Sequence, residues 1–418
     1  RLFAQDPLQG LRLIDLCREV FDVVVMNPPF GLPAAATKSH LKSAYPDTWK
    51  DIYAAFIERA LQLLNSNGML GAITPSMWQY SRQLRDLRQN LINLGSPRLL
   101  VEVGSGVMDD AAVEASIWTA SKKRNDGELW SLDLLNHPRE HRAELMRDSG
   151  ASWIKHRAED FVRVAEAPYC HHVPNNMLAL WKRVDRLENV ARIAKGNTTF
   201  DDFRFLRLWY EVPAGSVDKW KSYRSGGDFQ PFFAASRLRI YWENDGAAVR
   251  TWGVRKHGSD AQVMQSSELW FRAGLGYPRV GTLGFGVRVA PAGEIFSGSS
   301  VFLLPEISAM NLPLLALLNS APALALFEAH GRHRRTETIA LKDLPISWDD
   351  LAPIAEQLEK IAVSAVCAIR EWESTDETSL LFIRPYFDDS SIDSKSFSEG
   401  VFQKVTSAAK NASALIAQ

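Results

Sequence analysis

The sequence predicts an α/β protein, on the basis of two observations. From Phe21 to Leu135, apolar runs of strand length alternate with amphipathic helical segments, a rhythm that implies parallel crossovers and a doubly wound sheet. The run Phe21–Met26 holds three consecutive valines, which is typical of a parallel strand covered on both faces. After residue 190 the composition shifts to aromatic residues, arginines and glycines, so a second domain of a different kind is expected.

The alternation places each element of the first half in order. Phe21–Met26 is the first strand, and a long loop over residues 31–47, of the kind that often forms a lid, follows it. A helix over 52–64 ends at the stop signal Asn67-Gly68. The remaining elements are a strand over 69–73, a helix over 84–94, and strands over 99–103, 113–119 and 128–135.

The turn Asn27-Pro28-Pro29-Phe30 is the first candidate site. Ligands of open α/β sheets gather at the carboxyl ends of strands, and Asn27 falls at such an end. The two prolines lack a backbone N–H, so the turn offers carbonyl oxygens, and Asn27 adds a side-chain acceptor. This arrangement suits a bound amino group. The alternative is a proline turn that only closes the strand, with Phe30 in the core.

This tetrapeptide resembles the Asn-Pro-Pro-Phe/Tyr signature of S-adenosylmethionine-dependent DNA adenine methyltransferases of the large type IIG restriction-modification and BREX-type phage-defence family. The resemblance implies that Asn27 and the Pro28 carbonyl accept hydrogen bonds from the exocyclic amine of a flipped adenine, and that Phe30 stacks on the base. With Pro29, these are the predicted catalytic residues.

The resemblance also implies a Rossmann-like methyltransferase sheet, of which this chain carries the C-terminal part. In the family the glycine-rich cofactor loop precedes the catalytic turn, whereas this chain begins with Arg1 in what reads as the middle of a domain. A fragment is therefore expected, with a missing N-terminal methyltransferase segment as its partner.

S-adenosylmethionine is the implied cofactor, and Asp6 is the candidate contact, with Asp15 as runner-up; either could instead be a solvated turn or cap residue. The Gly-x-Gly turn in residues 101–106 could be a cofactor loop, but the residues after it read as a strand and not as a helix facing a ligand. By the resemblance, Met108 occupies the position that holds the flipped base, where its sulfur can pack on a ring.

Two later segments resemble the target-recognition domain of the same family. Residues 196–212 hold a glycine-threonine loop followed by an Arg-Phe strand, with Phe200 where the family usually has glycine; residues 274–297 have Gly276 in place of a usual threonine. Arginine suits a guanine edge or a phosphate, although a packed aromatic turn with Arg279 in solvent is the alternative. The candidate nucleic-acid-binding residues are Thr199, Arg204, Tyr277 and Arg279.

The densest basic cluster, residues 330–336, is a candidate phosphate clamp through Arg332, Arg334 and Arg335, unless its charges are only solvated. From Trp348 onward the apolar spacing is mostly helical. The predicted domains are a partial catalytic domain (1–150), a helical connector (151–190), a mixed α/β target-recognition domain (191–348) and a helical C-terminal region (349–418).

Composition limits the classes of partner. The formal net charge is −1, so contact with DNA must come from local basic patches. The three cysteines form no CxxC pair, which fits a reducing cytoplasm and argues against a cysteine zinc site. No metal site is expected, and the adjacent His171 and His172 read as a solvated pair. No stretch approaches the ~20 apolar residues of a membrane span.

These observations favour a site-specific DNA adenine methyltransferase of a restriction-modification or phage-defence system, with double-stranded DNA and possible other defence proteins as partners. One alternative is a non-enzymatic DNA-recognition or scaffold component. Another is a methyltransferase acting on RNA or on a protein glutamine, although such enzymes need no recognition domain of this size.

Overall fold

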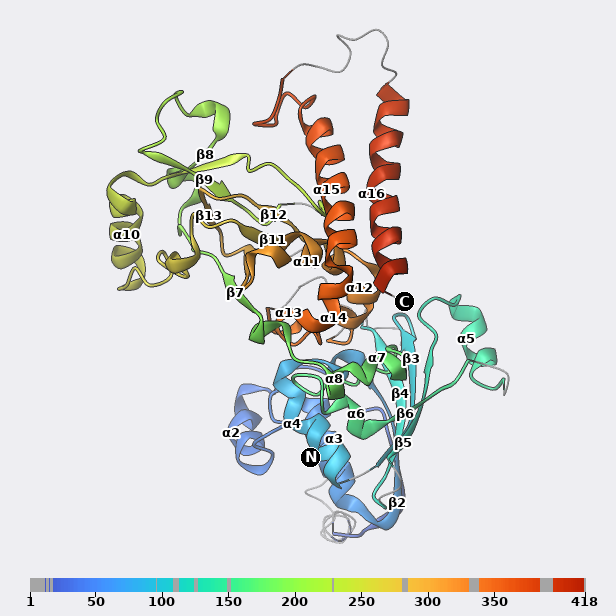
Figure 1. Cartoon of the computed structure of the whole chain (residues 1–418). Helices are drawn as coiled ribbons and strands as arrows, with labels where there is room; N and C mark the ends of the chain where they lie inside the picture. Colours follow the sequence, from blue (N-terminus) through green and yellow to red (C-terminus); the bar gives the residue numbers. More distant parts are fainter. Residues whose placement is uncertain are drawn as a thin grey trace. The chain divides into compact units, whose positions relative to one another are not determined.

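The computed structural model describes residues 12, 15, 18–94, 96–107, 113–123, 127–148, 152–227, 229–279, 285–330, 338–383 and 394–416. The chain divides into two compact units, Arg1–Arg183 with Glu328–Gly331, and Val184–Phe327 with Arg332–Gln418. Figure 1 labels their elements. Residues 151–183, expected in a connector, belong to the first unit; the other predicted domain boundaries stay predictions.

The first unit is an α/β body. Its strands are β1 (Phe21–Met26), β2 (Leu64–Pro75), β3 (Ser96–Gly104), β4 (Ala115–Ser121), β5 (Glu128–Asp133) and β6 (Ile154–Arg157). Its helices are α2 (Ala35–Ala44), α3 (Ile52–Leu63), α4 (Arg85–Leu94), α5 (Arg139–Leu145), α6 (Ala158–Phe161), α7 (Asn175–Leu178) and α8 (Leu180–Arg183). The helices α3 and α4, which the apolar spacing predicts, pack against β1, β2 and β3 (Figure 1).

The six strands form one mixed sheet in the order β1-β2-β4-β3-β5-β6. β1 pairs parallel with β2, and β3 with β5, whereas β4 is antiparallel to both of its neighbours. The predicted parallel pairing therefore holds for β1 with β2 and for β3 with β5, but not for β4. β3 ends at Gly104 and β4 begins at Ala115, a connection too short for a parallel crossover, which needs about a dozen residues or more.

The sheet register aligns the carboxyl ends of four strands along one edge. Met26 pairs with Ala72, and two residues further along β2, Thr74 pairs with Ser116 of β4. Ser116 in turn pairs with Glu102, and Glu102 with Asp133. The turn after β1 therefore lies at the same edge of the sheet as the ends of β2, β3 and β5.

Two local expectations in this unit fail. Residues 31–47 are not all loop, because α2 forms within them; its side chains are not buried, so no apolar period marks it in the sequence. His171 is not solvated: it is buried, its Nδ1 faces the Tyr169 carbonyl oxygen at 3.2 Å, and burial lowers its pKa. A neutral, packed imidazole replaces the expected surface pair.

The second unit holds two four-stranded sheets, in the orders β13-β9-β10-β8 and β12-β11-β14-β7. Its strands are β7 (Ala191–Lys195), β8 (Leu206–Leu208), β9 (Trp220–Arg224), β10 (Leu238–Tyr241), β11 (Gly274–Pro278), β12 (Arg288–Ala290), β13 (Glu294–Phe296) and β14 (Ser300–Pro305). Its helices are α9 (Asp202–Phe205), α10 (Glu243–His257), α11 (Asn311–Leu318), α12 (Ala321–Glu328), α13 (Thr338–Lys342), α14 (Trp348–Leu351), α15 (Ala355–Glu373) and α16 (Ser394–Ile416). The long helices α15 and α16 pack side by side (Figure 1). The C-terminal sequence predicts a helical region but not this packing.

The apolar stretch around Asn319-Ser320 forms two helices that meet at a bend of 79°. The Asn319 amide explains the break, since its Nδ2 donates to the carbonyl oxygens of Val287 and Leu315. Within the described ranges, no single helix is long and apolar enough to cross a membrane, and only this bent pair passes the same test of length and composition.

Candidate active site and nucleic-acid surface

The turn Asn27-Pro28-Pro29-Phe30 directly follows β1, at the carboxyl edge of the sheet. Asn27 and Pro29 are exposed, Pro28 is buried and Phe30 is half-buried. The turn therefore combines an exposed asparagine with a proline that is held in the core.

The N-terminus of α3 holds the far end of this turn. The Gly31 N–H donates to Asp51 Oδ1 at 3.2 Å, and the Ile52 N–H donates to the Gly31 carbonyl oxygen at 3.0 Å. Gly31 has φ +117, and a Cβ built there meets nothing within 4 Å, so glycine is needed for its backbone conformation and not for space. Burial raises the pKa of Asp51, and its bond from Gly31 partly offsets that rise.

Phe30 contacts the buried ring of Tyr53 on α3 edge to face, with 6.2 Å between ring centroids and 87° between planes. The Tyr53 hydroxyl is buried and has no hydrogen-bond partner among the described residues. Tyr53 therefore acts on Phe30 through its ring, and the half-buried Phe30 ring is oriented but not enclosed.

Glu102 of β3 is a buried carboxylate that the sequence did not single out. It accepts hydrogen bonds from the Ser76 hydroxyl and from Gln79 Nε2, the latter at 2.7 Å. The pKa of Glu102 is raised to about 7, chiefly by burial; the two hydrogen bonds lower it, and Asp133 and Glu114 add to the rise. A carboxyl group that titrates near neutrality thus lies in the row of strand ends that includes the turn after β1.

The Gly104-Ser105-Gly106 turn does not form a cofactor loop. Both glycines have positive φ, and a Cβ at Gly104 would lie 2.8 Å from Leu135 Cδ2 and 3.2 Å from Arg142 Nη1. Arg142 donates to the Val103 carbonyl oxygen, so its guanidinium already fills the space beside the turn. The chain then enters antiparallel β4, as the strand pattern after Gly106 predicts.

Several predicted site residues lie outside the described residues: Asp6, Met108, Arg332, Arg334 and Arg335. Their assignments stay predictions. The runner-up Asp15 is described and is exposed.

In the second unit, the two segments singled out in the sequence lie side by side. The Asn197 N–H donates to the Phe296 carbonyl oxygen, and Asn197 forms an isolated bridge with Ser297. A Cβ at Gly196 would lie 1.8 Å from the Phe296 carbonyl oxygen, so only glycine permits this approach. Residues that are 100 positions apart thereby meet in a buried contact.

Two of the predicted nucleic-acid contacts serve the packing of this unit. Thr199 is buried, and its hydroxyl donates to Asp202 within the loop. Tyr277 is fully buried in β11, which is the packed aromatic turn that the sequence left as an alternative. Arg279 is half-buried next to it, and its backbone N–H donates to the Ser299 carbonyl oxygen at 2.8 Å.

Arg204 is exposed in α9, and its guanidinium lies 4.6 Å from the centroid of the Trp252 ring. Arg255 and Lys256 of α10 also lie over Trp252, at 5.9 and 4.9 Å, and Phe203 is 93% exposed. We call Phe203, Arg204, Trp252, Arg255 and Lys256 the α10 patch. The basic run at the end of α10 could have identified it, but no sequence argument joined that run to Arg204.

Among the described residues, no group of three or more histidine, cysteine or acidic side chains could hold a metal ion.

Comparisons with known proteins agree with these features. Residues 11–107 match the family model described as Eco57I restriction-modification methylase. The chain is 22% identical over 389 residues to the adenine-specific methyltransferase PglX of Lacticaseibacillus casei (strain Zhang), across 86% of this chain and 32% of PglX. It is 25% identical over 322 residues to the adenine-specific methyltransferase BrxX of Escherichia coli O9:H4 (strain HS), across 72% of this chain and 26% of BrxX. The chain thus spans about a third or less of the length of these curated relatives.

The solved structure of the Type IIL restriction-modification enzyme MmeI in complex with DNA is similar over 93% of this chain and 54% of the MmeI chain. The TM-score is 0.53 at 13% sequence identity, so this likeness concerns the fold.

Proposed function

Because the chain is a relative of the Eco57I-family adenine methyltransferases PglX and BrxX, we propose that it takes part in the site-specific transfer of a methyl group to the exocyclic amine of adenine in DNA. The observation that carries the proposal is the Asn27-Pro28-Pro29-Phe30 turn at the carboxyl end of β1. Its exposed asparagine, buried proline and oriented phenylalanine suit the capture of a flipped base.

In this proposal the Asn27 side chain and the Pro28 carbonyl accept hydrogen bonds from the adenine amine and orient its lone pair. Phe30 packs on the base and is held by Tyr53. The bond from Gly31 to Asp51 keeps the turn in place on α3. An aromatic contact and hydrogen bonds to the base edge offset the few kcal/mol that base extrusion costs.

S-adenosylmethionine would supply the methyl group, but the described residues do not fit a complete cofactor site. The candidate Asp6 lies outside them, and the Gly104 turn is filled by Arg142. We therefore derive no step through the cofactor. Val23 and Val25 of β1 are 60% and 80% exposed, although the valine run predicts a strand covered on both faces. This exposed edge supports a further methyltransferase segment that packs along β1 and completes a Rossmann-like sheet.

Residues 191–348 of the second unit are proposed as the target-recognition domain, and α15 and α16 of the same unit as its helical C-terminal region. The half-buried Arg279 and the α10 patch support contact with double-stranded DNA. Aromatic rings among guanidinium and ammonium groups are typical of nucleic-acid surfaces. A cytoplasmic location and other defence-system proteins as partners belong to the same proposal.

Replacing Asn27 tests the catalytic assignment. In the intact protein, Asn27→Ala should lower methyl transfer to DNA by orders of magnitude and leave DNA affinity nearly unchanged, because the lost interaction acts in the transition state. Transfer of labelled methyl from S-adenosylmethionine measures this. Turnover near the wild-type rate would reject Asn27 as the residue that orients the amine.

One observation favours a second function, DNA recognition without catalysis. The described residues offer a DNA-binding type of surface but no cofactor cradle. A DNA mobility shift together with the absence of methyl transfer by the intact protein would support this alternative.

A further inference from the structure

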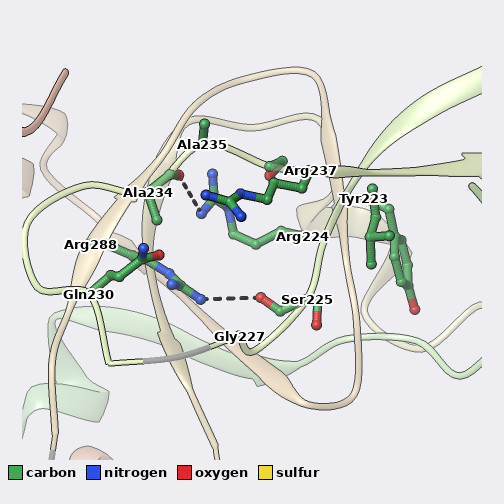
Figure 2. Close-up of a pocket in the computed structure, with 11 residues that line it drawn as sticks. Tyr223, Arg224, Ser225, Gly227, Gln230, Ala234, Ala235, Arg237 and Arg288 are labelled. Atoms are coloured by element: carbon green, nitrogen blue, oxygen red, sulfur yellow. Dashed lines mark hydrogen bonds between the residues drawn. The ribbon is translucent and has the colours of Figure 1, made fainter. Parts of the chain in front are cut away.

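The second unit contains a cavity of about 290 Å³, and the described residues that line it include three arginines and no acidic side chain. Figure 2 shows Arg224, at the end of β9, and Arg288 of β12 on its walls, with Arg237 beside them. Gly227, Gln230 and Arg237 are exposed, so this side of the cavity opens to solvent. Neither Arg224 nor Arg237 was among the predicted site residues.

Arg224 is the central group of this pocket. Its side chain is 3% exposed, and its Nε donates to Glu294 Oε2 at 2.5 Å while Nη1 donates to the Ala234 carbonyl oxygen at 3.3 Å. Its Nη2 is buried and has no hydrogen-bond partner among the described residues. A buried guanidinium N–H without an acceptor is rare in folded proteins and calls for an explanation.

A second buried donor lines the same cavity. The Ser236 hydroxyl is buried and also has no partner among the residues that the structure describes. Arg288 is 2% exposed, and its Nη2 donates to the carbonyl oxygens of Ser225 and Gly226. The cavity is therefore rich in donors, and an anion with several acceptor oxygens satisfies them best.

The acidic groups near the pocket are already engaged with other partners. Glu294 is paired with Arg224, Asp376 is paired with Arg237 at 2.9 Å, and Glu373 accepts from the Ala235 N–H and the Ser379 hydroxyl. Arg239 also faces Glu294, and burial lowers its pKa.

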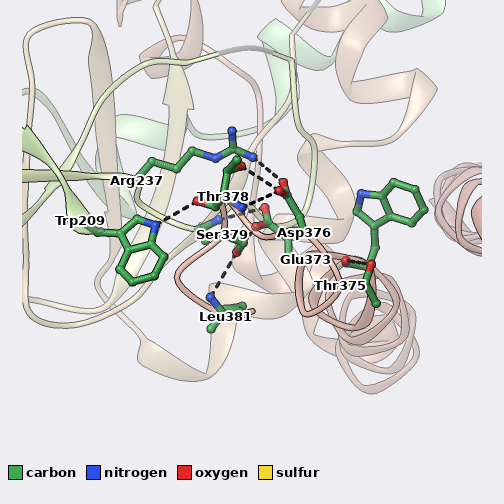
Figure 3. Close-up of polar contacts among 10 residues, drawn as sticks. Trp209, Arg237, Glu373, Thr375, Asp376, Thr378, Ser379 and Leu381 are labelled. Carbon is green, nitrogen blue, oxygen red and sulfur yellow. Dashed lines mark hydrogen bonds and ion pairs between the residues drawn. The ribbon is translucent and has the colours of Figure 1, made fainter. Parts of the chain in front are cut away.

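The wall formed by residues 234–238 is held by the C-terminal end of α15. Figure 3 shows Arg237 reaching Asp376 and the Trp209 indole donating to the Thr378 carbonyl oxygen at 2.9 Å. These bonds fasten the wall of the pocket to the turn after α15. A preorganised pocket loses less conformational freedom on binding.

We propose that this pocket binds a phosphate group of the DNA backbone, with the free Nη2 of Arg224 and the Ser236 hydroxyl as donors. Guanidinium groups match phosphate geometry, and the volume has room for a phosphodiester with part of its sugar, since one water takes about 30 Å³. The pocket also adjoins the second recognition segment: the Ser297 N–H donates to the Arg224 carbonyl oxygen and the Gly226 N–H to Ser299 Oγ. The choice of DNA as the source of the phosphate rests on the proposed function.

Two variants of the intact protein test the pocket, with one control. The double variant Arg224→Gln with Glu294→Gln removes both partners of the buried ion pair, so neither charge is left alone. Ser236→Ala removes one hydroxyl with little risk to folding. Arg192→Gln is the control, because Arg192 pairs with Glu268 at the surface and does not line the pocket.

The first arm measures thermal unfolding in sodium phosphate against sodium chloride of equal ionic strength. Phosphate should raise the unfolding midpoint of the wild type and of Arg192→Gln, because a ligand that binds only the folded state stabilises it. The rise should vanish in the double variant and shrink in Ser236→Ala. The absence of any phosphate-specific rise in the wild type would overturn the proposal.

The second arm measures affinity for duplex DNA over a range of salt concentrations. The double variant should bind about tenfold more weakly, and the slope of log affinity against log salt should decrease by about one. If the double variant does not fold, Ser236→Ala decides, and wild-type behaviour of Ser236→Ala in both arms would reject the site.

The two arms separate this inference from the proposed function. A wild type that binds DNA, with variants that keep the wild-type salt slope, rejects the pocket as a backbone contact and leaves the proposed function standing. A wild type that fails to bind DNA but gains stability from phosphate rejects the DNA function and assigns the pocket to a free phosphate compound.

Discussion

Phe30 contacts the ring of Tyr53 edge to face. The role of Phe30 can therefore be measured separately from that of the Tyr53 hydroxyl. We expect Phe30→Ala to weaken capture of the target base by ~1–3 kcal/mol, the range for stacking of a base on an aromatic ring. The loss should be smaller on a duplex in which the target adenine is mismatched or faces an abasic site, because that adenine is already unpaired. Binding and methyl-transfer assays on both kinds of duplex measure the difference.

Tyr53→Phe is the matched control for this change. It keeps the ring that contacts Phe30 and removes a buried hydroxyl without a described partner, so base capture should remain near the wild-type level. Equal losses by Phe30→Ala on paired and unpaired targets would mean that Phe30 only packs against α3.

The raised pKa of Glu102 should make the free energy of unfolding depend on pH. Its pKa is raised to about 7 from an ordinary value of 4.5, so between these values the folded protein binds more protons than the unfolded chain. The free energy of unfolding should therefore fall as pH rises through this window, by up to about 3 kcal/mol. Urea unfolding at a series of pH values measures the fall.

Glu102→Gln should flatten this dependence, because a glutamine keeps the shape but cannot ionise. Glu140→Gln, a change at an exposed acid on α5, should leave the wild-type profile in place. A wild-type profile that is flat between the two pKa values would show that Glu102 is ionised in the fold at low pH.

The φ angle of Phe200 is one that glycine adopts more readily than phenylalanine. Phe200 has φ +60, a left-handed conformation that favours glycine, and it stands where the resembled family usually has glycine. Its ring stacks on His257 at 3.9 Å between centroids. The loop therefore retains the conformation that glycine would favour, and the stacking contact compensates for the strain.

At the scale of elements, the C-terminal turn of α10 brings Arg255 and Lys256 over Trp252. Replacing both with alanine should weaken the binding of all DNA sequences about equally and reduce the salt slope by about two, because contacts to phosphates carry no sequence information. Arg279→Ala should instead relax sequence preference if that guanidinium reads a base. Affinity measurements on cognate and unrelated duplexes at several salt concentrations distinguish the two.

Lys360→Gln provides the charge control for α10, because Lys360 pairs with Glu356 on the exposed face of α15. It should change neither the affinity nor the slope. An unchanged salt slope in the Arg255 and Lys256 variant would place the DNA surface elsewhere in the molecule.

At the scale of the whole molecule, the described residues include the proposed base-binding turn and the proposed recognition domain, and they form no complete cofactor cradle. We expect the 418-residue chain by itself to bind no S-adenosylmethionine at micromolar concentration, and to bind it when a segment with the glycine-rich loop is supplied. Calorimetry measures both. Micromolar binding by this chain alone would contradict the assignment and require a cofactor site within it.

If the chain alone bound S-adenosylmethionine, the variant Gly104→Val could not show whether the Gly-x-Gly turn holds it. A side chain at Gly104 collides with Leu135 and Arg142, so the variant would disturb the packing of β3 and α5 whether or not a cofactor binds. Arg139→Ala is a less disruptive test of this turn. The Arg139 guanidinium lies beside Gly106, 3.3 Å from the position that a Cβ would take there.

The sequence by itself determined the local features whose signals are short in range. The valine run and the two prolines define β1 and its turn, the apolar spacing defines α3, α4 and α15, and the turn carries the family resemblance. These features depend on neighbouring residues and on backbone restrictions, which a sequence displays directly.

Only the tertiary structure decided which distant residues meet. Four features join segments that are separated in the chain. They are the antiparallel pairing of β4, the line of strand ends that includes Glu102, the bridge between Asn197 and Ser297, and the arginine pocket around Arg224. Thr199 and Tyr277 turned out to be buried for the same reason. The burial of a side chain and the pairing of a strand depend on packing between elements. The periodicity of residues within one element does not predict that packing.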